Sequence, residues 1–177
     1  MPKDWFVVED FLSGRACEEL IARGEALGFA GATIDAAGGP VTDHNVRNND
    51  RVIFDDMSLA RALWQGLAQQ CDGYAPRWQP IGINERFRMY RYEVGQVFKW
   101  HRDGYYRRNE RERSGLTFMV YLNDGFVGGH TEFEAHSVAP KSGMALCFRH
   151  ELLHQGAPLT SSQKYVLRSD IMYREPG

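Results

Sequence analysis

The spacing of apolar residues along the chain changes from a helical to an extended period near residue 80. Before that point, two stretches repeat apolar residues at helical intervals. Ser13 is a suitable N-cap for the first, which runs to about Leu27. Asp55 or Asp56 is suited to cap the second, which ends near Cys71. We therefore predict two helices in the first 80 residues, together with short strands at residues 5–8 and 51–54.

Beyond residue 80 the apolar residues form short extended runs separated by turn residues. The run Leu116–Asn123 is almost continuously β-prone, as expected of a strand buried on both faces. Several short strands at this spacing are typical of a sandwich or a jelly-roll barrel. We predict an α+β fold in one domain, residues 1–177, with a helical part at about 1–80 packed on one sheet of a β core at about 81–177. The predicted core strands are 84–92, 97–101, 116–123, 131–133, 145–148 and 165–173.

Composition and charge exclude several classes of protein. A charged fraction of 25% and a hydrophobic fraction of 43% are ordinary for a globular protein and argue against disorder. The formal net charge of −2 gives no overall basic footprint for nucleic acid. Three scattered cysteines fit a reducing compartment. With no signal peptide and no apolar run long enough for a membrane span, we expect a cytoplasmic location and no membrane association.

One pair of residues at the end of a predicted strand suggests a metal site. His101 and Asp103 are two residues apart, and side chains two apart on a strand point the same way. Gly104 follows and allows a turn to approach a metal closely. One further histidine would complete the two-histidine, one-carboxylate set that holds Fe(II) with positions left open. The same ligands also suit a zinc hydrolase. The candidates for the third ligand are His130, His136, His150 and His154.

The residues around this pair add a family resemblance. Tyr92 precedes His101 by nine positions, and Tyr121-Leu122-Asn123 and Gly128-Gly129-His130-Thr131-Glu132-Phe133 follow it. His154 precedes a Gly-Ala-Pro turn, and Lys164 follows His154 by ten positions. This ordered set, from Phe87 to Tyr173, resembles the prolyl 4-hydroxylase-like branch of the Fe(II)/2-oxoglutarate-dependent dioxygenases. The resemblance implies a double-stranded β-helix, which is a jelly-roll core.

The resemblance also implies roles for particular residues. His101, Asp103 and His154 match the metal ligands of that family. Lys164 matches the basic residue that pairs with the distal carboxylate of 2-oxoglutarate. Tyr121 matches a tyrosine that often bonds the same carboxylate, and Tyr92 lies on the strand that lines the pocket. Arg168 stands four residues after Lys164 on the same face of the last strand, so it is a second candidate for the anchor. Alternatively, Arg168 forms an ion pair with a carboxylate of the barrel.

The implied cofactor is Fe(II), with 2-oxoglutarate and O2 as cosubstrates. The expected reaction hydroxylates a substrate while 2-oxoglutarate is decarboxylated to succinate. Family members often use ascorbate to rescue over-oxidised iron, so ascorbate is expected as an auxiliary reductant. Because the iron carries the chemistry, no catalytic carboxylate pair is required.

The sequence specifies the substrate less closely than it specifies the cofactor and cosubstrates. The resemblance favours a prolyl residue in a peptide or protein. Alternatives are a small molecule, a nucleic-acid base in a demethylase, or a non-catalytic binding module, and the net charge argues against the nucleic acid. The arginine-rich loop Arg107–Arg113, with Arg47, Arg51 and Tyr105-Tyr106, could clamp an acidic polypeptide, or the loop is simply solvated. The oligomeric state stays open.

Overall fold

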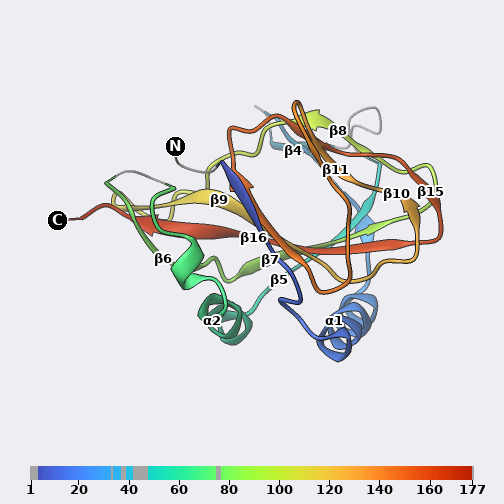
Figure 1. Cartoon of the computed structure of the whole chain (residues 1–177), viewed down its shortest axis with the longest axis horizontal. Helices are drawn as coiled ribbons and strands as arrows, with labels where there is room; N and C mark the ends of the chain where they lie inside the picture. Colours follow the sequence, from blue (N-terminus) through green and yellow to red (C-terminus); the bar gives the residue numbers. More distant parts are fainter. Residues whose placement is uncertain (1–3, 33, 37–38, 42–47, 75–76, 177) are drawn as a thin grey trace.

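The chain folds mainly into β-sheet with few helices (Figure 1). The computed structural model describes residues 4–32, 34–36, 39–41, 48–74 and 77–176. Arg47 and the first part of the polar segment around it lie outside the described residues. The helices are α1 (Gly14–Leu27), α2 (Met57–Gln65) and the 3-10 turn η1 (Ala68–Gln70). The strands are β1 (Trp5–Val8), β2 (Ala30–Gly31), β3 (Ile34–Ala36), β4 (Gly39–Val41), β5 (Asp50–Asp55), β6 (Gln79–Ile83), β7 (Arg86–Tyr92), β8 (Phe98–His101), β9 (Glu112–Tyr121), β10 (Val127–Gly128), β11 (Thr131–Phe133), β12 (Ser137–Val138), β13 (Ala145–Arg149), β14 (His154–Gly156), β15 (Leu159–Ser161) and β16 (Lys164–Arg174).

An eight-stranded sheet forms the base of the molecule. Its strand order is β1-β13-β9-β16-β7-β5-β2, and β6 pairs with β16 off this path. The long strand β16 therefore lies in the middle, between β9 and β7. Its apolar residues are buried on both faces. The neighbouring β9 is also largely buried, as its nearly continuous β-prone run, Leu116–Asn123, predicts.

A smaller sheet lies across one part of this base. Its order is β12-β11-β14-β8, and a separate pair joins β10 to β15. The two main sheets make the jelly-roll architecture that the sequence predicts, and neither sheet closes on itself. Within the smaller sheet, β14 pairs with β8 so that His154 lies opposite His101. Residues 53 positions apart in the sequence thus become cross-strand neighbours.

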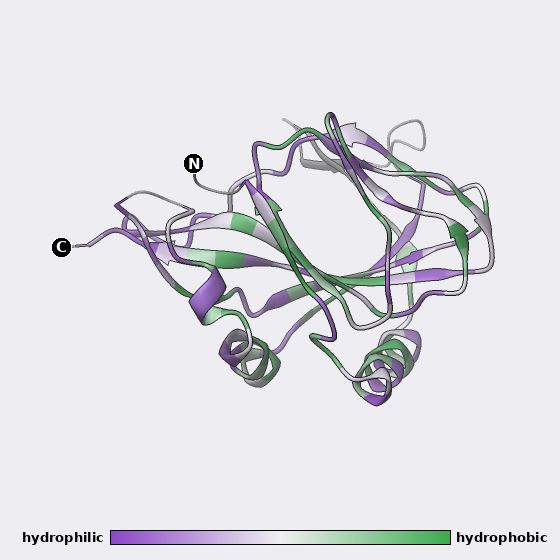
Figure 2. Ribbon diagram, in the orientation of Figure 1, coloured by the Kyte–Doolittle hydropathy of each residue, from purple (hydrophilic) through white to green (hydrophobic). Residues whose placement is uncertain are grey.

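Both helices pack on the outer face of the large sheet, below it in Figure 1. Alternation along β16 divides its side chains between two cores. Leu167 belongs to the core beneath the helices, with Leu20 of α1 and Leu63 of α2. Val166 belongs to the core between the two sheets. Figure 2 shows this as short hydrophobic and hydrophilic bands that succeed one another along the strands.

The helix ends follow the predicted caps. The Ser13 side chain accepts a hydrogen bond from the amide of Ala16, and α1 ends before Gly28. The Asp56 side chain accepts one from the amide of Leu59. However, α2 ends at Gln65, earlier than predicted, and η1 completes the segment. A Cβ at Gly66 would lie 2.8 Å from the Phe11 ring, so the chain passes close to the β1–α1 connection there.

The first 80 residues are less helical than the sequence suggests. The strand β1 pairs with β13 along its whole length, and β5 pairs with β7. Both are therefore part of the large sheet, while the helices cover it. The division into a single domain with two parts stays a prediction. Within the described ranges, none of the helices combines the length and apolarity that a membrane crossing requires.

Candidate metal centre

Three side chains with metal-ligating atoms meet between the two sheets. His101 and His154 come from the paired strands β8 and β14, and Asp103 follows β8 after one residue. One ligand atom from each lies within 4.8 Å of the other two. The Asp103 carboxylate is 3.8 Å from Nε2 of His101 and 3.7 Å from Nε2 of His154. The pair predicted from spacing and the third residue implied by the family resemblance are thus brought together.

Backbone hydrogen bonds fix the orientation of both imidazoles. Nδ1 of His101 lies 2.7 Å from the carbonyl oxygen of Lys99, and Nδ1 of His154 lies 2.9 Å from that of Leu152. A carbonyl accepts only from a protonated nitrogen, so each Nδ1 carries the proton and each Nε2 keeps its lone pair. Burial lowers the pKa of His154, and burial with the neighbouring His154 lowers the pKa of His101 to about 4. Both rings are therefore neutral near pH 7, as ligation requires.

Two donors hold the carboxylate of Asp103. The Thr117 hydroxyl donates to Oδ2 at 2.5 Å, and Nη2 of Arg168 lies 3.1 Å from the same oxygen. Burial by itself would raise the pKa of Asp103, but the Arg168 guanidinium, the two imidazoles and Thr117 outweigh it and hold the pKa well below its usual range. Asp103 is thus an anion in this site and suits a hard cation.

A chain of hydrogen-bonded polar side chains, which no sequence pattern indicates, extends from this carboxylate. Nδ1 of His150 lies 2.9 Å from the Thr117 hydroxyl, and its Nε2 lies 2.8 Å from the hydroxyl of Ser114. Ser114 in turn accepts from the amide of Tyr106. His150, one of the competing ligand candidates, is therefore buried in support of the site. Its partners lie on β9, and only the cross-strand register brings them to His150.

Lys164 lines the same pocket and is buried, with 3% of the residue exposed. The pocket is bounded by the three metal-type ligands and by Tyr92, Lys164 and Arg168. The ammonium of Lys164 donates to the carbonyl oxygen of Gly129 at 2.5 Å and lies over the rings of Tyr92 and Tyr121, 5.2 and 5.5 Å from their centroids. Burial lowers its pKa to about 7. A buried cation with spare donors at the end of a pocket is suited to a carboxylate.

Arg168 lies closer to the metal ligands than to Lys164's end of the pocket. Its guanidinium bridges Asp103 and Asp170, which is 3.3 Å away. The pKa of Arg168, which burial alone would lower, is raised because these two carboxylates surround it. The ion pair with a barrel carboxylate, one of the two alternatives from the sequence, is thus formed.

The two predicted tyrosines are placed differently. Tyr92 borders the pocket, as its strand position suggests. Tyr121 is fully buried, and its hydroxyl is 2.6 Å from the hydroxyl of Thr131, which itself borders the pocket. Burial raises the pKa of Tyr121, so the phenol is neutral. Thr131 therefore lies between Tyr121 and the pocket, and the sequence did not single it out.

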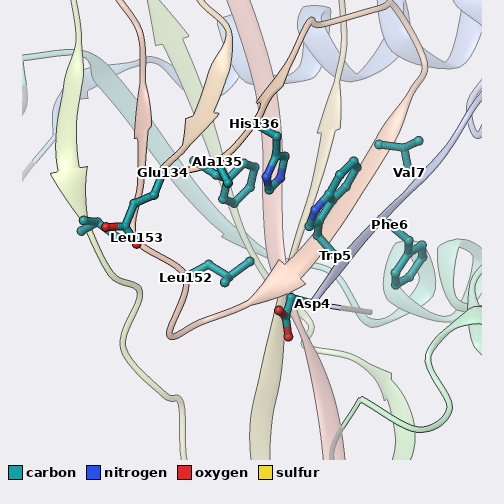
Figure 3. A pocket seen from close by; sticks show the side chains of 10 residues that line it. Asp4, Trp5, Phe6, Val7, Glu134, Ala135, His136, Leu152 and Leu153 are labelled. Carbon is teal, nitrogen blue, oxygen red and sulfur yellow. The ribbon is translucent and has the colours of Figure 1, made fainter. Parts of the chain in front are cut away.

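The remaining candidate histidines lie away from the three ligands. Nδ1 of His130 is 3.3 Å from the hydroxyl of Ser137. The ring of His136 is stacked between Trp5 and Phe133, with centroid distances of 4.4 Å to each. A large open cavity of about 700 Å³ borders this stack, between β1 and the loops before β12 and β14 (Figure 3). This cavity is therefore separate from the pocket that contains the metal-type ligands, with which it shares no lining residue.

Ion pairs and ring contacts hold much of the arginine-rich loop. Arg108 pairs with Glu85, and Arg113 lies over the Trp78 ring, 4.4 Å from its centroid. The hydroxyl of the neighbouring Tyr105 donates to Glu151. Arg107 forms an isolated bridge with Arg113 at the start of β9. Side chains of the loop thus contact other residues of the protein. The role of the loop as a substrate clamp stays a prediction.

Comparison with known proteins agrees with this site. Residues 87–169 match the model of the 2OG-Fe(II) oxygenase superfamily, and this range contains all three metal-type ligands and Lys164. The segment that carries the candidate site thus matches a 2-oxoglutarate-dependent oxygenase domain. Its resemblance within the superfamily is to prolyl 4-hydroxylases.

Individual relatives support that resemblance. A protein of Acanthamoeba polyphaga mimivirus named "Putative prolyl 4-hydroxylase" is 25% identical over 96% of this chain and 74% of its own length. A prolyl hydroxylase of Trichoplax adhaerens, solved with a peptide fragment of the hypoxia inducible factor oxygen degradation domain, has a TM-score of 0.73 at 17% identity, covering 97% of this chain and 84% of that one. The viral collagen prolyl hydroxylase of Paramecium bursaria Chlorella virus-1, solved with 2OG, has a TM-score of 0.64 at 19% identity, covering 98% and 97%. At these identities, the structural matches establish the fold.

Proposed function

We propose that the protein is an Fe(II)- and 2-oxoglutarate-dependent hydroxylase whose substrate is a prolyl residue in a peptide or protein. The observation that carries the proposal is the convergence of His101, Asp103 and His154 in a pocket that has a buried lysine at its far end. Two imidazoles and one carboxylate suit Fe(II) and leave coordination positions for cosubstrate and O2.

The chain's own residues would act mainly by positioning. His101 and His154 present unprotonated Nε2 atoms because the backbone holds the protons on Nδ1. Asp103 supplies the anionic ligand, and Thr117 and Arg168 fix its orientation. When bound, iron and 2-oxoglutarate supply the oxidative chemistry, in which 2-oxoglutarate is decarboxylated to succinate and the substrate gains one oxygen atom.

Lys164 is the proposed anchor for the distal carboxylate of 2-oxoglutarate. Its buried side chain lines the pocket, and Thr131 and Tyr92 border the same space. Tyr121 would act through Thr131, since their hydroxyls are hydrogen-bonded. Arg168 is already engaged by Asp103 and Asp170, which leaves the anchor role to Lys164.

The prolyl substrate rests on the family resemblance and on the relatives' names. A small-molecule substrate is the second candidate, because the superfamily assignment itself does not specify the substrate. A cytoplasmic location and the use of ascorbate as an auxiliary reductant are parts of the same proposal.

A turnover assay with mass spectrometry tests this function. The purified protein, stripped of metal and reloaded with Fe(II), should convert 2-oxoglutarate to succinate and add one oxygen to a proline-containing peptide. His101→Ala or His154→Ala should lower turnover by a factor of a thousand or more and weaken Fe(II) binding, because each removes a ligand. His130→Ala is the matched control, since His130 lies outside the three ligands.

The same assay separates the competing possibilities. Reloading with Zn(II) should give no succinate. Full activity with zinc, or full activity of His154→Ala with iron, would show that the metal assignment is wrong. Succinate formation without any oxygen gain on a peptide library would exclude the peptidyl substrate and leave the oxygenase assignment intact.

A further inference from the structure

Beyond Asp103, charged side chains continue across the inner face of the large sheet. The order is Asp103, Arg168, Asp170 and Arg88, with alternating sign. Arg168 and Arg88 are cross-strand partners on β16 and β7, so their side chains lie on the same face of the sheet. Asp170 lies opposite Thr117, the residue that donates to Asp103. The row therefore begins at the metal-type ligands and leads away from them.

This row lies on the side of the site that the cosubstrate leaves free. Lys164 and Arg168 are four residues apart on β16, which corresponds to roughly 13 Å along a strand. With 2-oxoglutarate reaching from Lys164 toward the three ligands, the space near Lys164 is filled. The face of the large sheet that carries Arg168 and Arg88 is then the side left for a substrate.

Arg88 is the member of the row with unused binding capacity. Its Nη1 is 3.7 Å from Asp170, beyond hydrogen-bond distance, and this buried nitrogen has no hydrogen-bond partner. The Asp170 carboxylate is shared, since it also faces Arg168 at 3.3 Å. About a quarter of the Arg88 side chain is exposed, compared with 4% for Asp170. Part of the Arg88 side chain is thus accessible from outside, although its Nη1 is buried, whereas Asp170 is almost fully covered.

The formal charges of the loaded site leave Arg88 without a carboxylate of its own. Iron and Lys164 balance Asp103 and the dianionic cosubstrate, and Asp170 balances Arg168. Arg88 remains as a cation at the open end of the row. A guanidinium with free donors binds a carboxylate through two parallel hydrogen bonds.

We infer that Arg88 is a specificity-determining residue that binds an anionic group of the substrate. The substrate would be an acidic peptide, with a glutamyl or aspartyl side chain next to the residue that is hydroxylated. The inference rests on the proposed function and adds a substrate class to it. Ile53, the cross-strand neighbour of Arg88 on β5, is 44% exposed and offers an apolar contact beside the cation.

Peptide binding tests the inference directly. The probes are three capped pentapeptides with a central proline preceded by Glu, Gln or Lys, added without O2 to protein loaded with Fe(II) and 2-oxoglutarate. We expect the glutamyl peptide to bind about tenfold or more tightly than the glutaminyl peptide, and the lysyl peptide to bind most weakly. Arg88→Met should remove this preference, and Arg88→Lys should retain part of it.

Arg86→Met is the matched control. Arg86 lies two residues away on the same face of β7, but it is already paired with Asp55 through two hydrogen bonds of 3.0 and 3.2 Å. This variant should keep the parent's preference and the parent's substrate-free succinate formation. Thermal melting and circular dichroism establish that each variant is folded, and Arg88→Lys keeps the test valid if Arg88→Met does not fold.

Two results would overturn the inference. One is equal binding of the three peptides, or no binding of the glutamyl peptide, by the parent protein. The other is an undiminished glutamyl preference in folded Arg88→Met or Arg88→Lys. If the proposed function itself is wrong, a different result is expected. The protein loaded with Fe(II) and 2-oxoglutarate would then form no succinate, even when no peptide is added.

Discussion

Lys164 carries the least compensated buried charge among the candidate site residues. Within the described part of the chain, no carboxylate forms an ion pair with it, and its ammonium is satisfied by a backbone carbonyl and two aromatic faces. Burial therefore lowers its pKa to about 7, so about half of the molecules hold a neutral lysine at that pH. A bound carboxylate would favour the charged form.

This makes cosubstrate binding dependent on pH. Above about pH 7 the empty pocket holds a neutral Lys164, and binding of the 2-oxoglutarate carboxylate must take up a proton. We expect the affinity for 2-oxoglutarate to fall as pH rises from 7 to 9, approaching tenfold per pH unit. Calorimetry in buffers of different ionisation enthalpy measures the proton uptake.

Substitutions at Lys164 and Arg168 show which of the two residues is responsible for the proton uptake. Lys164→Arg should bind 2-oxoglutarate with no proton uptake, because arginine stays charged over this range. Arg168→Gln should retain the uptake, because Lys164 is unchanged. If Arg168→Gln removes the uptake or weakens 2-oxoglutarate binding more than Lys164→Met does, Arg168 rather than Lys164 is the anchor.

At the scale of elements, the turn before β13 joins the large sheet to the start of α1. Gly143 has φ +79° and donates its amide to the carbonyl oxygen of Tyr121, while its own carbonyl accepts from Leu12. A Cβ at this position would lie 2.1 Å from the carbonyl oxygen of Leu12. Both backbone conformation and space therefore require glycine here.

Gly143→Ala should lower the free energy of unfolding by about 3 kcal/mol or more, because it adds a backbone clash to the left-handed strain. Gly125→Ala is the control: Gly125 has the same φ, +79°, with no atom within 4 Å of a Cβ. That variant should lose only about 1 kcal/mol, the strain alone. Urea unfolding measures both, and equal losses would mean that the contact with Leu12 is unimportant.

Local patterns in the sequence were sufficient for the two helices and for half of the strands, and β14, which carries His154, was not predicted. Ser13 and Asp56 act as caps because capping depends on residues within one turn. The partners of β1 could not be predicted in this way, because β13 lies about 140 residues further along the chain. The early end of α2 at Gln65 also depends on a distant residue, Phe11, which packs against Gly66.

In the candidate site, too, some features follow from local sequence and others depend on distant residues. The spacing of His101 and Asp103 is local, and the order of Tyr92, His154 and Lys164 matches a known family, so these residues could be named in advance. The pairing of Arg168 with Asp103 and the support from His150 through Thr117 depend on register between strands. No sequence period encodes such contacts, and the sequence therefore left the role of Arg168 open.

At the scale of the whole molecule, the last strand in the sequence is central in the large sheet. β16 pairs with β9, β7 and β6, and no other strand joins β9 to β7 in the described sheet. The two halves of the sheet therefore depend on residues 164–174. Leu167 and Ile171, both fully buried, also complete the core beneath the helices.

A chain that stops at residue 163 should not form this sheet. We expect it to lack a cooperative thermal transition and the strand signal in circular dichroism. A chain that stops at residue 174 should melt like the full sequence, because the two described residues after Arg174 lie outside every strand. A cooperative transition in the shorter chain would mean that β9 and β7 can pair without β16.

The central place of β16 also affects how the protein is made. A ribosome adds about 5–20 residues per second, so β9, which ends at Tyr121, waits roughly 3 to 10 s before β16 is complete at Arg174. During that time β9 and β7 each lack the partner strand on one side, and such unpaired edges are prone to associate with other chains. Folding must therefore wait until translation is nearly complete, and the growing chain is a natural client for chaperones that hold unfolded segments.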